Sequence, residues 1–489
     1  MRLLPVLALV LVACCSRSGD HTGAGAGSAA GSGSAAGSGS AAGSGSAATN
    51  DPWAASATPR PPDTPESRQR RAEAALGRVA AIEPQVAKLR RLAFERAVPT
   101  RYQKPDEFRA FVRREIAKEL PAAKSRDLTA ALAHLGFLAK PNDLAEVEEQ
   151  AMTTQAGAYY DPAAKAFFVV MVPDSDLLLD TMSAHELTHA LQDQHFDLAK
   201  YLPSNSGLDD DAAAARRFVV EGDATFVMLL YTMRSMLGGE IPPPVLKVLR
   251  EQIEQLANED LAALQAQVRQ QSALFGGMDR EIQKSIDAMD DIPPAVLVPL
   301  LDSYMKGALV ALTAYERGGW AGVDALYRDP PSSTEQVLHP ATKLFPVRDR
   351  PHRIKLVRGA GRELAGNVLG ELQWRIYFEL WKVPHAAEAA AGWAGDRYAV
   401  VRRADGRLIG RIATLWDTPD DARQFAEAYL ASLAGRFPGA GADGSGAAGI
   451  ARPDGGRVMI RVAGARVVIV DGADDASALD ALVRTAVFD

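Results

Sequence analysis

Apolar residues recur at helical spacing where ordered sequence begins. From about residue 67 onward they lie three or four positions apart, at Leu76, Val79, Ile82, Val86, Leu89 and Leu92. This spacing predicts an amphipathic helix, and similar patterns predict two more over residues 108–120 and 128–135, the last ending at Gly136. We therefore expect a helical N-terminal region over residues 67–150.

The pattern changes after residue 157. The run Tyr160-Asp161-Pro162 is a turn signal, and aromatic and β-branched residues follow it over residues 166–172. Together they predict a β-hairpin. Asp174, Ser175 and Asp176 are residues that favour a helix start, so the segment 177–193 is predicted to be helical. A further helix is expected around residues 216–230, most of it apolar.

The composition changes again near residue 351. The patterns there predict a helix at 367–381, strands at 398–401 and 407–415, a helix at 419–433, strands at 457–462 and 466–470, and a final helix at 475–487. The order strand, strand, helix, repeated twice, indicates a small α+β module over residues 351–489. No cluster of ligands or acid–base residues stands out in this module, which favours a packing or protein-contact role.

Composition excludes several classes of protein. The chain has 489 residues, 47% of them hydrophobic, with a formal net charge of −7. This apolar content excludes wholesale disorder, and the absence of a dense basic run argues against a nucleic-acid partner. The two cysteines, Cys14 and Cys15, both lie near the N-terminus. The folded body therefore contains no disulfide, zinc–thiolate site or cysteine nucleophile.

The N-terminus has the pattern of an export signal. Arg2 precedes an apolar run over residues 3–13, which is too short to span a bilayer. The run ends in Leu11-Val12-Ala13-Cys14, which resembles the lipobox of bacterial lipoproteins. We expect residues 1–13 to be a signal peptide and Cys14 to carry lipid; an ordinary cleaved signal is the alternative. Because no Asp follows Cys14, an outer-membrane or cell-surface location is favoured over the inner membrane.

A low-complexity tether is predicted over residues 14–66. Residues 23–48 are all Gly, Ala or Ser, and such a segment cannot bury a core. As a flexible chain those residues would span roughly 30 Å. The pattern predicts a globular body held away from a membrane surface.

Metal chemistry is indicated inside the helix predicted at 177–193. It contains His185-Glu186-Leu187-Thr188-His189. Two histidines four positions apart project from the same helix face, so both imidazoles can bind one Zn²⁺, while Glu186 lies beside the metal without being a ligand. The alternative is a helix whose histidines only pack in the core.

Two residues are candidates for the third ligand. His195 lies ten positions after His185, but position 192 is Gln and not a Gly that would let the chain turn back. On a continuous helix His195 would point roughly 80° away from His185. Glu221 lies in the next predicted helix among apolar residues, where a carboxylate is costly unless it is paired or binds a metal. Glu221 is therefore favoured.

These motifs resemble a known family. The run His185-Glu186-Leu187-Thr188-His189, followed by a Glu on a later helix, is similar to the gluzincin metallopeptidases, the thermolysin-like and peptidase MA-like group. The resemblance covers roughly residues 89–340. It implies a predominantly helical, zincin-like catalytic domain over residues 151–350 with a short antiparallel sheet, and hence an α+β protein. It also implies a zinc endopeptidase whose ligands are His185, His189 and Glu221.

One departure from that family concerns the residues behind the ligands. Thermolysin-like enzymes usually have an Asp four positions after the ligand Glu, where this chain has Thr225. Asp193 and Asp223 are then the candidates to support His185.

The expected reaction is hydrolysis of a peptide or protein substrate. Zn²⁺ would polarise the scissile carbonyl and lower the pKa of water, and Glu186 would take the water's proton and deliver it to the leaving amine. His339 is a candidate oxyanion donor and lies in the Pro-bounded run Pro330-Pro331-Ser332-Ser333-Thr334-Glu335-Gln336-Val337-Leu338-His339-Pro340. A structural loop is the alternative for this run. A binding or scaffolding lipoprotein without turnover is the alternative for the whole chain.

Overall fold

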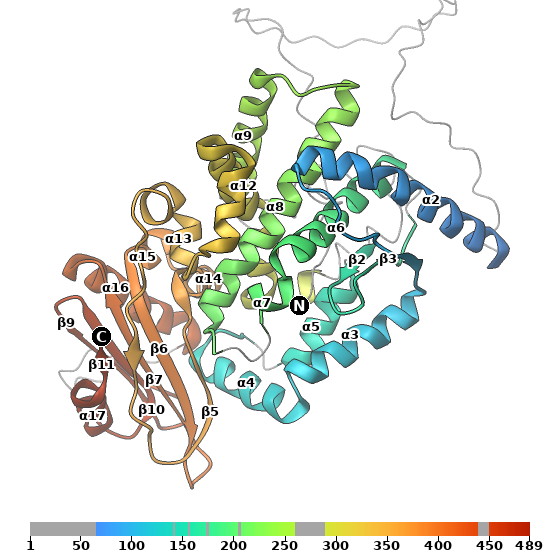
Figure 1. The fold of residues 1–489 in the computed structure, drawn as a ribbon. Helices are drawn as coiled ribbons and strands as arrows, with labels where there is room; N and C mark the ends of the chain where they lie inside the picture. The colour runs from blue at the N-terminus through green and yellow to red at the C-terminus, as the bar shows by residue number, and fades with distance from the viewer. Residues whose placement is uncertain are drawn as a thin grey trace, which may run out of the picture.

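The computed structural model describes residues 65–139, 142–154, 157–172, 176–203, 207–259, 289–438 and 449–489. Within them the chain forms an α+β fold with a helical body and a C-terminal sheet beside it (Figure 1). The predicted signal peptide, Cys14 and most of the predicted tether lie outside the described residues.

Three long helices form the centre of the helical body. They are α6 (Asp176–Phe196), α8 (Asp210–Leu237) and α12 (Pro294–Arg328), and they run close together in Figure 1. Helix α12 contains a kink at Gly318 and Gly319, where the backbone leaves helical angles. It is long and apolar enough to cross a membrane, but most of its apolar stretch is buried inside the protein. This is the property of a core helix.

Other helices surround these three. They are α2 (Pro65–Arg90), α3 (Pro105–Glu119), α4 (Ala122–Leu135), α5 (Leu144–Thr154), α7 (Leu198–Tyr201), α9 (Pro243–Asn258), the 3₁₀ turn η1 (Met289–Asp291), α13 (Thr334–Leu338) and the π-helical turn η2 (Pro340–Leu344). Helix α2 packs along α6 through Val79, Ile82 and Val86, which are fully or almost fully buried in the same core as α6, α8 and α12. The prediction of three helices before residue 136 is confirmed.

The sheet beside α6 differs in part from the prediction. Strands β2 (Ala158–Asp161) and β3 (Ala166–Val169) form the expected antiparallel hairpin. Strand β1 (Thr100–Tyr102) pairs with β3 in parallel, so the sheet has the order β1-β3-β2 and is mixed rather than antiparallel. Three residues are too few for a period-two pattern, which is why the sequence did not predict β1.

The C-terminal part is built on a larger sheet than predicted. Its six antiparallel strands follow the order β5 (Arg362–Asn367), β6 (Trp393–Arg402), β7 (Leu408–Trp416), β10 (Arg466–Ala473), β9 (Arg457–Ala463) and β8 (Gly449–Ala451). The four predicted strands are the central ones. Strands β5 and β8 are the two edges, and neither has a clear alternating pattern.

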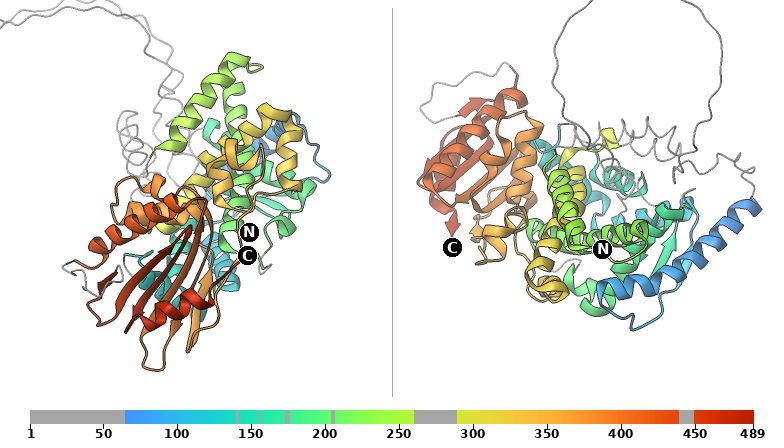
Figure 2. Two further views of the ribbon diagram at one scale, coloured as in Figure 1. Left: turned by 90° about the vertical axis from the view of Figure 1, so that its left-hand side faces the viewer. Right: turned by 90° about the horizontal axis from the view of Figure 1, so that it is seen from above.

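Helices cover both faces of this sheet, as Figure 2 shows. One face packs on α14 (Gly370–Leu380), α15 (Ala386–Ala390) and α16 (Pro419–Arg436), and the other on α17 (Ser477–Thr485) and the small pair β4 (Ile354–Lys355) and β11 (Val487–Phe488). The three predicted helices of the module correspond to α14, α16 and α17.

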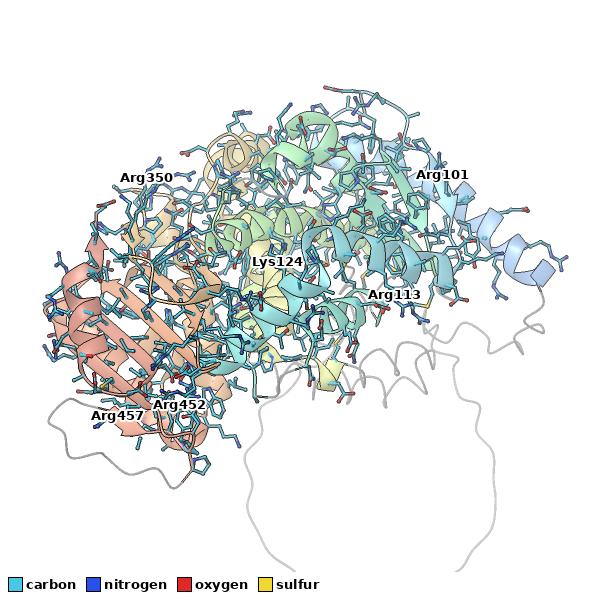
Figure 3. The ribbon with its side chains drawn as sticks, turned by 90° about the horizontal axis from the view of Figure 1, so that it is seen from below. Arg101, Arg113, Lys124, Arg350, Arg452 and Arg457 are labelled. Carbon is cyan, nitrogen blue, oxygen red and sulfur yellow. The ribbon has the colours of Figure 1, made fainter. Side chains whose placement is uncertain are left out.

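The hydrophobic cores extend across the domain boundaries that the sequence predicted at residues 150 and 350. The largest core runs from Val79 in α2 to Ile376 in α14. Helix α4 also packs against β5 and β7, and its His134 Nε2 lies 3.1 Å from the Asp471 carbonyl oxygen on β10. Figure 3 shows Lys124 of α4 between Arg113 on the helical body and Arg452 and Arg457 on the sheet. The N-terminal helices are therefore packed into both halves of the molecule.

Candidate metal centre

Helix α6 carries the predicted metal motif. His185, Glu186 and His189 lie on it and are fully buried. The two imidazole Nε2 atoms are 3.0 Å apart, because residues four positions apart share one face of a helix. Their rings meet edge to face, with centroids 4.6 Å apart.

Glu221 reaches this pair from α8. Its Oε2 lies 3.3 Å from His185 Nε2 and 3.5 Å from His189 Nε2. The ligand atoms of the three residues all lie within 4.8 Å of one another. The structure therefore brings together the three residues that the sequence singled out as ligands, from two helices.

The donor atoms have the orientation that a metal requires. Gln192 Nε2 donates to the Val220 carbonyl (2.9 Å) and to Asp223 Oδ2 (3.2 Å), so its Oε1 faces His189 Nδ1 at 2.8 Å. Nδ1 must then carry the ring proton, which leaves the lone pair of His189 Nε2 directed at His185 and Glu221. A proton or a cation must lie between two imidazole nitrogens 3.0 Å apart. Two such nitrogens and one carboxylate fit a zinc ion and leave one tetrahedral position open.

Burial and the Glu221 carboxylate shift the pKa values of the two histidines in opposite directions. Burial lowers the pKa of His185 to about 4, so this imidazole is neutral and able to bind a metal at physiological pH. Burial would also lower the pKa of His189, but the nearby Glu221 carboxylate outweighs it and raises that pKa.

Glu186 lies next to this cluster with one oxygen anchored. Its Oε2 accepts a hydrogen bond of 2.9 Å from the Tyr160 backbone N–H on strand β2. Its Oε1 is buried and has no hydrogen-bond partner among the described residues. Burial raises the pKa of Glu186 to about 8. Glu186 is therefore a carboxyl group with one free oxygen and a pKa close to neutral, the properties of a group that exchanges protons.

A polar chain behind His189 was not predicted in full. Gln192 links His189 to Asp223, and Asp223 also accepts hydrogen bonds from Arg90 Nε (2.9 Å) and the Tyr327 hydroxyl (2.9 Å). Of these residues only Asp223 was a predicted support, and it was predicted for His185. It acts on His189 instead. The Gln at position 192, considered in the sequence only as an obstacle to a turn, is the connecting residue.

Asp193, the other predicted support, is bound elsewhere. Its carboxylate accepts hydrogen bonds from the Tyr160 hydroxyl (2.7 Å) and from Lys165 Nζ (2.7 Å), which ties α6 to the hairpin. His185 Nδ1 has no hydrogen-bond partner within the described part of the chain. The ring of Tyr304 on α12 packs near His185, with centroids 5.6 Å apart.

A close helix crossing positions Glu221. Gly222 follows it, and a Cβ atom at this position would lie 2.1 Å from the carbonyl carbon of Gly307 on α12. No side chain fits there, so Gly222 lets α8 and α12 approach at the level of the candidate metal ligands. In the run Glu221-Gly222-Asp223, the first residue contacts the two histidines, the second contacts α12, and the third accepts a hydrogen bond from Gln192.

His195 does not join the cluster. Its Nε2 lies 2.7 Å from the Ala93 carbonyl oxygen, and its Nδ1 lies 3.7 Å from Glu95. Helix α6 continues to Phe196 without a turn, so the ring points away from His185, as the helical geometry predicts.

His339 contacts a residue of α14 in this structure, and its role as an oxyanion donor stays a prediction. Its Nε2 lies 2.7 Å from Glu371 Oε1 on α14. The preceding residues of its loop fasten α13 to the first turn of α8, where Thr334 Oγ1 donates to Asp211 at 2.5 Å. Glu221 lies ten residues further along α8, about 15 Å at 1.5 Å per residue. The run therefore has the contacts of a structural loop, the alternative stated for it.

A second acidic group lies beside this loop. Glu335, Asp349 and Asp417 have carboxylate oxygens within 4.8 Å of one another. Lys343 Nζ lies among them, at 3.0 Å, 2.5 Å and 2.6 Å respectively. The ammonium group contacts all three carboxylates, so this group is an ion-pair cluster.

Comparison with known proteins gives a match for the C-terminal part of the chain. A family model described as a domain of unknown function, DUF8575, matches residues 355–483, which form most of the C-terminal sheet and its helices. No curated protein and no solved structure matches the chain. The match does not extend to the candidate metal centre.

Proposed function

We propose that this protein is a zinc-dependent metallopeptidase. The observation that carries the proposal is the convergence of His185, His189 and Glu221 from two helices, with the free carboxyl oxygen of Glu186 beside them. Two imidazoles and one carboxylate with a fourth position open form the ligand set of catalytic, rather than structural, zinc sites. The resemblance to gluzincin peptidases supports the same assignment.

The ligands and Glu186 would have distinct roles in peptide hydrolysis. His185, His189 and Glu221 would hold a zinc ion, which would supply a Lewis acid for the substrate carbonyl and the attacking water. Glu186 accepts a proton from that water through its free Oε1 and transfers it to the leaving amine. The Tyr160 N–H holds the other oxygen, Oε2, so the free oxygen keeps a fixed direction.

The N-terminal sequence supports an extracytoplasmic location for this activity. We propose that Cys14 carries lipid and that the tether holds the body outside the membrane, at the outer membrane or cell surface. The substrate class is then peptide or protein.

The second candidate is a binding or scaffolding lipoprotein without turnover. The complete burial of His185, Glu186 and His189 favours it, because a substrate must reach these atoms for hydrolysis to occur. The presence of all four expected residues, His185, Glu186, His189 and Glu221, favours the peptidase.

Glu186→Gln distinguishes the two candidates. Because Glu186 is not a proposed ligand, the variant should keep about one zinc ion per chain while its cleavage of a diverse peptide library falls by about 10⁴-fold. Zinc content is measured by mass spectrometry and cleavage by product identification. Equal cleavage by wild type and variant would remove the main support for the peptidase assignment, because the cleavage would not depend on Glu186. No cleavage by zinc-loaded wild type would support the binding protein.

A further inference from the structure

Arg90, the last residue of α2, is buried behind the metal centre. Its side chain has no exposed surface. It makes two hydrogen bonds with Asp223, from Nε to Oδ1 (2.9 Å) and from Nη2 to Oδ2 (3.2 Å), and a third from Nη2 to Asp324 (2.7 Å). Its guanidinium also lies 4.6 Å from the ring centre of Trp320. Burying a guanidinium this completely is costly unless its partners hold it in one geometry.

The contacts of Arg90 continue to a proposed zinc ligand. Asp223 Oδ2 accepts a hydrogen bond from Gln192 Nε2, and Gln192 Oε1 accepts one from His189 Nδ1. Gln192 can present Oε1 to His189 only while its amide group is held by the acceptors on its other side, Asp223 and the Val220 carbonyl. The orientation of His189 therefore depends on the position of the Asp223 carboxylate.

Arg90 is the only cation that donates to Asp223 among the contacts of the described residues. Without it, Asp223 would keep only neutral donors, Gln192 and the Tyr327 hydroxyl, in a fully buried place. A buried carboxylate that loses its counter-charge is strongly destabilised, so Asp223 would have to move or its surroundings would have to open. Either change would release Gln192.

We propose that Arg90 is a positioning residue for the metal centre. Through Asp223 and Gln192 it holds the His189 imidazole with Nε2 directed at the metal, so that helix α2 contributes to the site. This inference rests on the proposed zinc function. It assigns to α2, which follows the predicted tether directly, a supporting role at the metal centre.

Arg78 provides a matched control on the same helix. It joins α2 to α6 by donating to Asp180 through Nε and through Nη2 (2.8 Å), and by an ion pair with Asp176 (3.1 Å). Among the described residues, its hydrogen bonds and ion pairs do not include Asp223 or Gln192. Arg78→Met therefore weakens the attachment of α2 to α6 without breaking the chain to His189.

The test measures the zinc dissociation constant and the visible spectrum of the Co²⁺-loaded, full-length protein. Arg90→Met should weaken zinc binding by about 10-fold to 100-fold, the usual effect of losing a group that supports a metal ligand, and should shift the Co²⁺ bands. Arg78→Met should leave both unchanged. If Arg90→Met has wild-type affinity and spectrum, or if Arg78→Met has the same loss, the inference is wrong.

The route through Asp223 has its own test. In a double-mutant cycle, Arg90→Met should add little to the loss of zinc affinity already caused by Asp223→Asn, because both break the same chain. Fully additive losses would overturn this route.

Arg90→Lys replaces Arg90→Met as the test variant if Arg90→Met does not fold. Lysine keeps the positive charge but cannot bond both Asp223 oxygens and Asp324 at once. It should give an affinity between those of wild type and Asp223→Asn, and wild-type affinity and spectrum would contradict the inference. If wild type itself binds no zinc, the proposed function fails together with the inference; if only the variants behave like wild type, the inference alone fails.

Discussion

Glu221 is the residue that distinguishes the gluzincin ligand set from the alternative with His195. Its Oε2 is within 3.5 Å of both imidazoles, whereas His195 Nε2 lies 2.7 Å from a backbone carbonyl of the loop before β1. Glu221→Gln should therefore lower zinc occupancy sharply, because a neutral amide is a poor ligand, and His195→Ala should leave occupancy nearly unchanged. Zinc analysis of the purified variants checks this. The reverse order would favour a three-histidine site.

Gly222 should be intolerant of a side chain. Gly222→Ala would bring a Cβ atom to 2.1 Å from the Gly307 carbonyl carbon and push α8 from α12. We expect the free energy of unfolding in urea to fall by about 1 to 3 kcal/mol, as for other overpacked cores.

Gly77 on α2 is the control for that substitution. A Cβ atom there meets nothing within 4 Å, so Gly77→Ala should stabilise the helix by up to about 1 kcal/mol. A Gly222→Ala protein as stable as wild type would mean that the two helices are not in contact at this level.

The residues of the site that could be predicted were those with a recognisable local pattern. His185, Glu186 and His189 follow from helical periodicity, and Glu221 from the cost of an acid in an apolar helix. Arg90 and Tyr327 could not be predicted, because their contacts with Asp223 span 133 and 104 residues. The role of His339 as an oxyanion donor was predicted from its loop and its residue type alone. Neither of these specifies which surface the imidazole ring contacts.

Elements with a clear period were also predictable, and short or mixed ones were not. The hairpin β2–β3 and the helices α6, α14, α16 and α17 have the expected types. Strand β1 has three residues, and edge strands β5 and β8 alternate poorly, so no local pattern distinguishes them from loops. Helix α12, which contains Pro299 and the kink at Gly318 and Gly319, was not predicted either.

Asp471 on strand β10 forms buried ion pairs with Arg436 and Arg452, and these should make the stability of the C-terminal sheet depend on pH. Asp471 accepts hydrogen bonds from Arg436 (2.9 Å) and Arg452. Burial alone would raise its pKa, but the two guanidinium groups outweigh it and hold the pKa below its usual value of 3.8. A carboxylate with a lowered pKa stabilises the fold at all pH values above its unfolded pKa, and this stabilisation is lost as the pH falls through the folded pKa.

Asp471→Asn should therefore lower the free energy of unfolding by about 3 to 5 kcal/mol at pH 7, because the buried Arg436 guanidinium loses its counter-charge and Arg452 loses one of its two carboxylate partners. The difference from wild type should persist down to about pH 4 and close below it, as wild-type Asp471 becomes protonated. Denaturant unfolding at a series of pH values measures it. If the difference in the free energy of unfolding grew below pH 4, the pKa of Asp471 in the folded protein could not be lowered as stated.

At the scale of the whole molecule, the predicted lipid anchor at Cys14 would determine the location of the folded body. Cys14→Ser should abolish incorporation of labelled fatty acid and move the protein from the detergent phase to the aqueous phase on partitioning. Cys15→Ser is the matched control and should behave like wild type. Unchanged partitioning of the Cys14 variant would contradict the lipid anchor and favour an ordinary cleaved signal.

The most direct measurement for the whole proposal is a zinc titration of metal-free, full-length wild-type protein, with cleavage of a substrate peptide as the readout. We expect no cleavage without metal and a rate that rises linearly to a plateau at about one zinc ion per chain, because one set of ligands forms one catalytic site. Cleavage that is independent of zinc, or a full equivalent of bound zinc with no cleavage of any peptide in a diverse library, would contradict the assignment of this centre as a peptidase site.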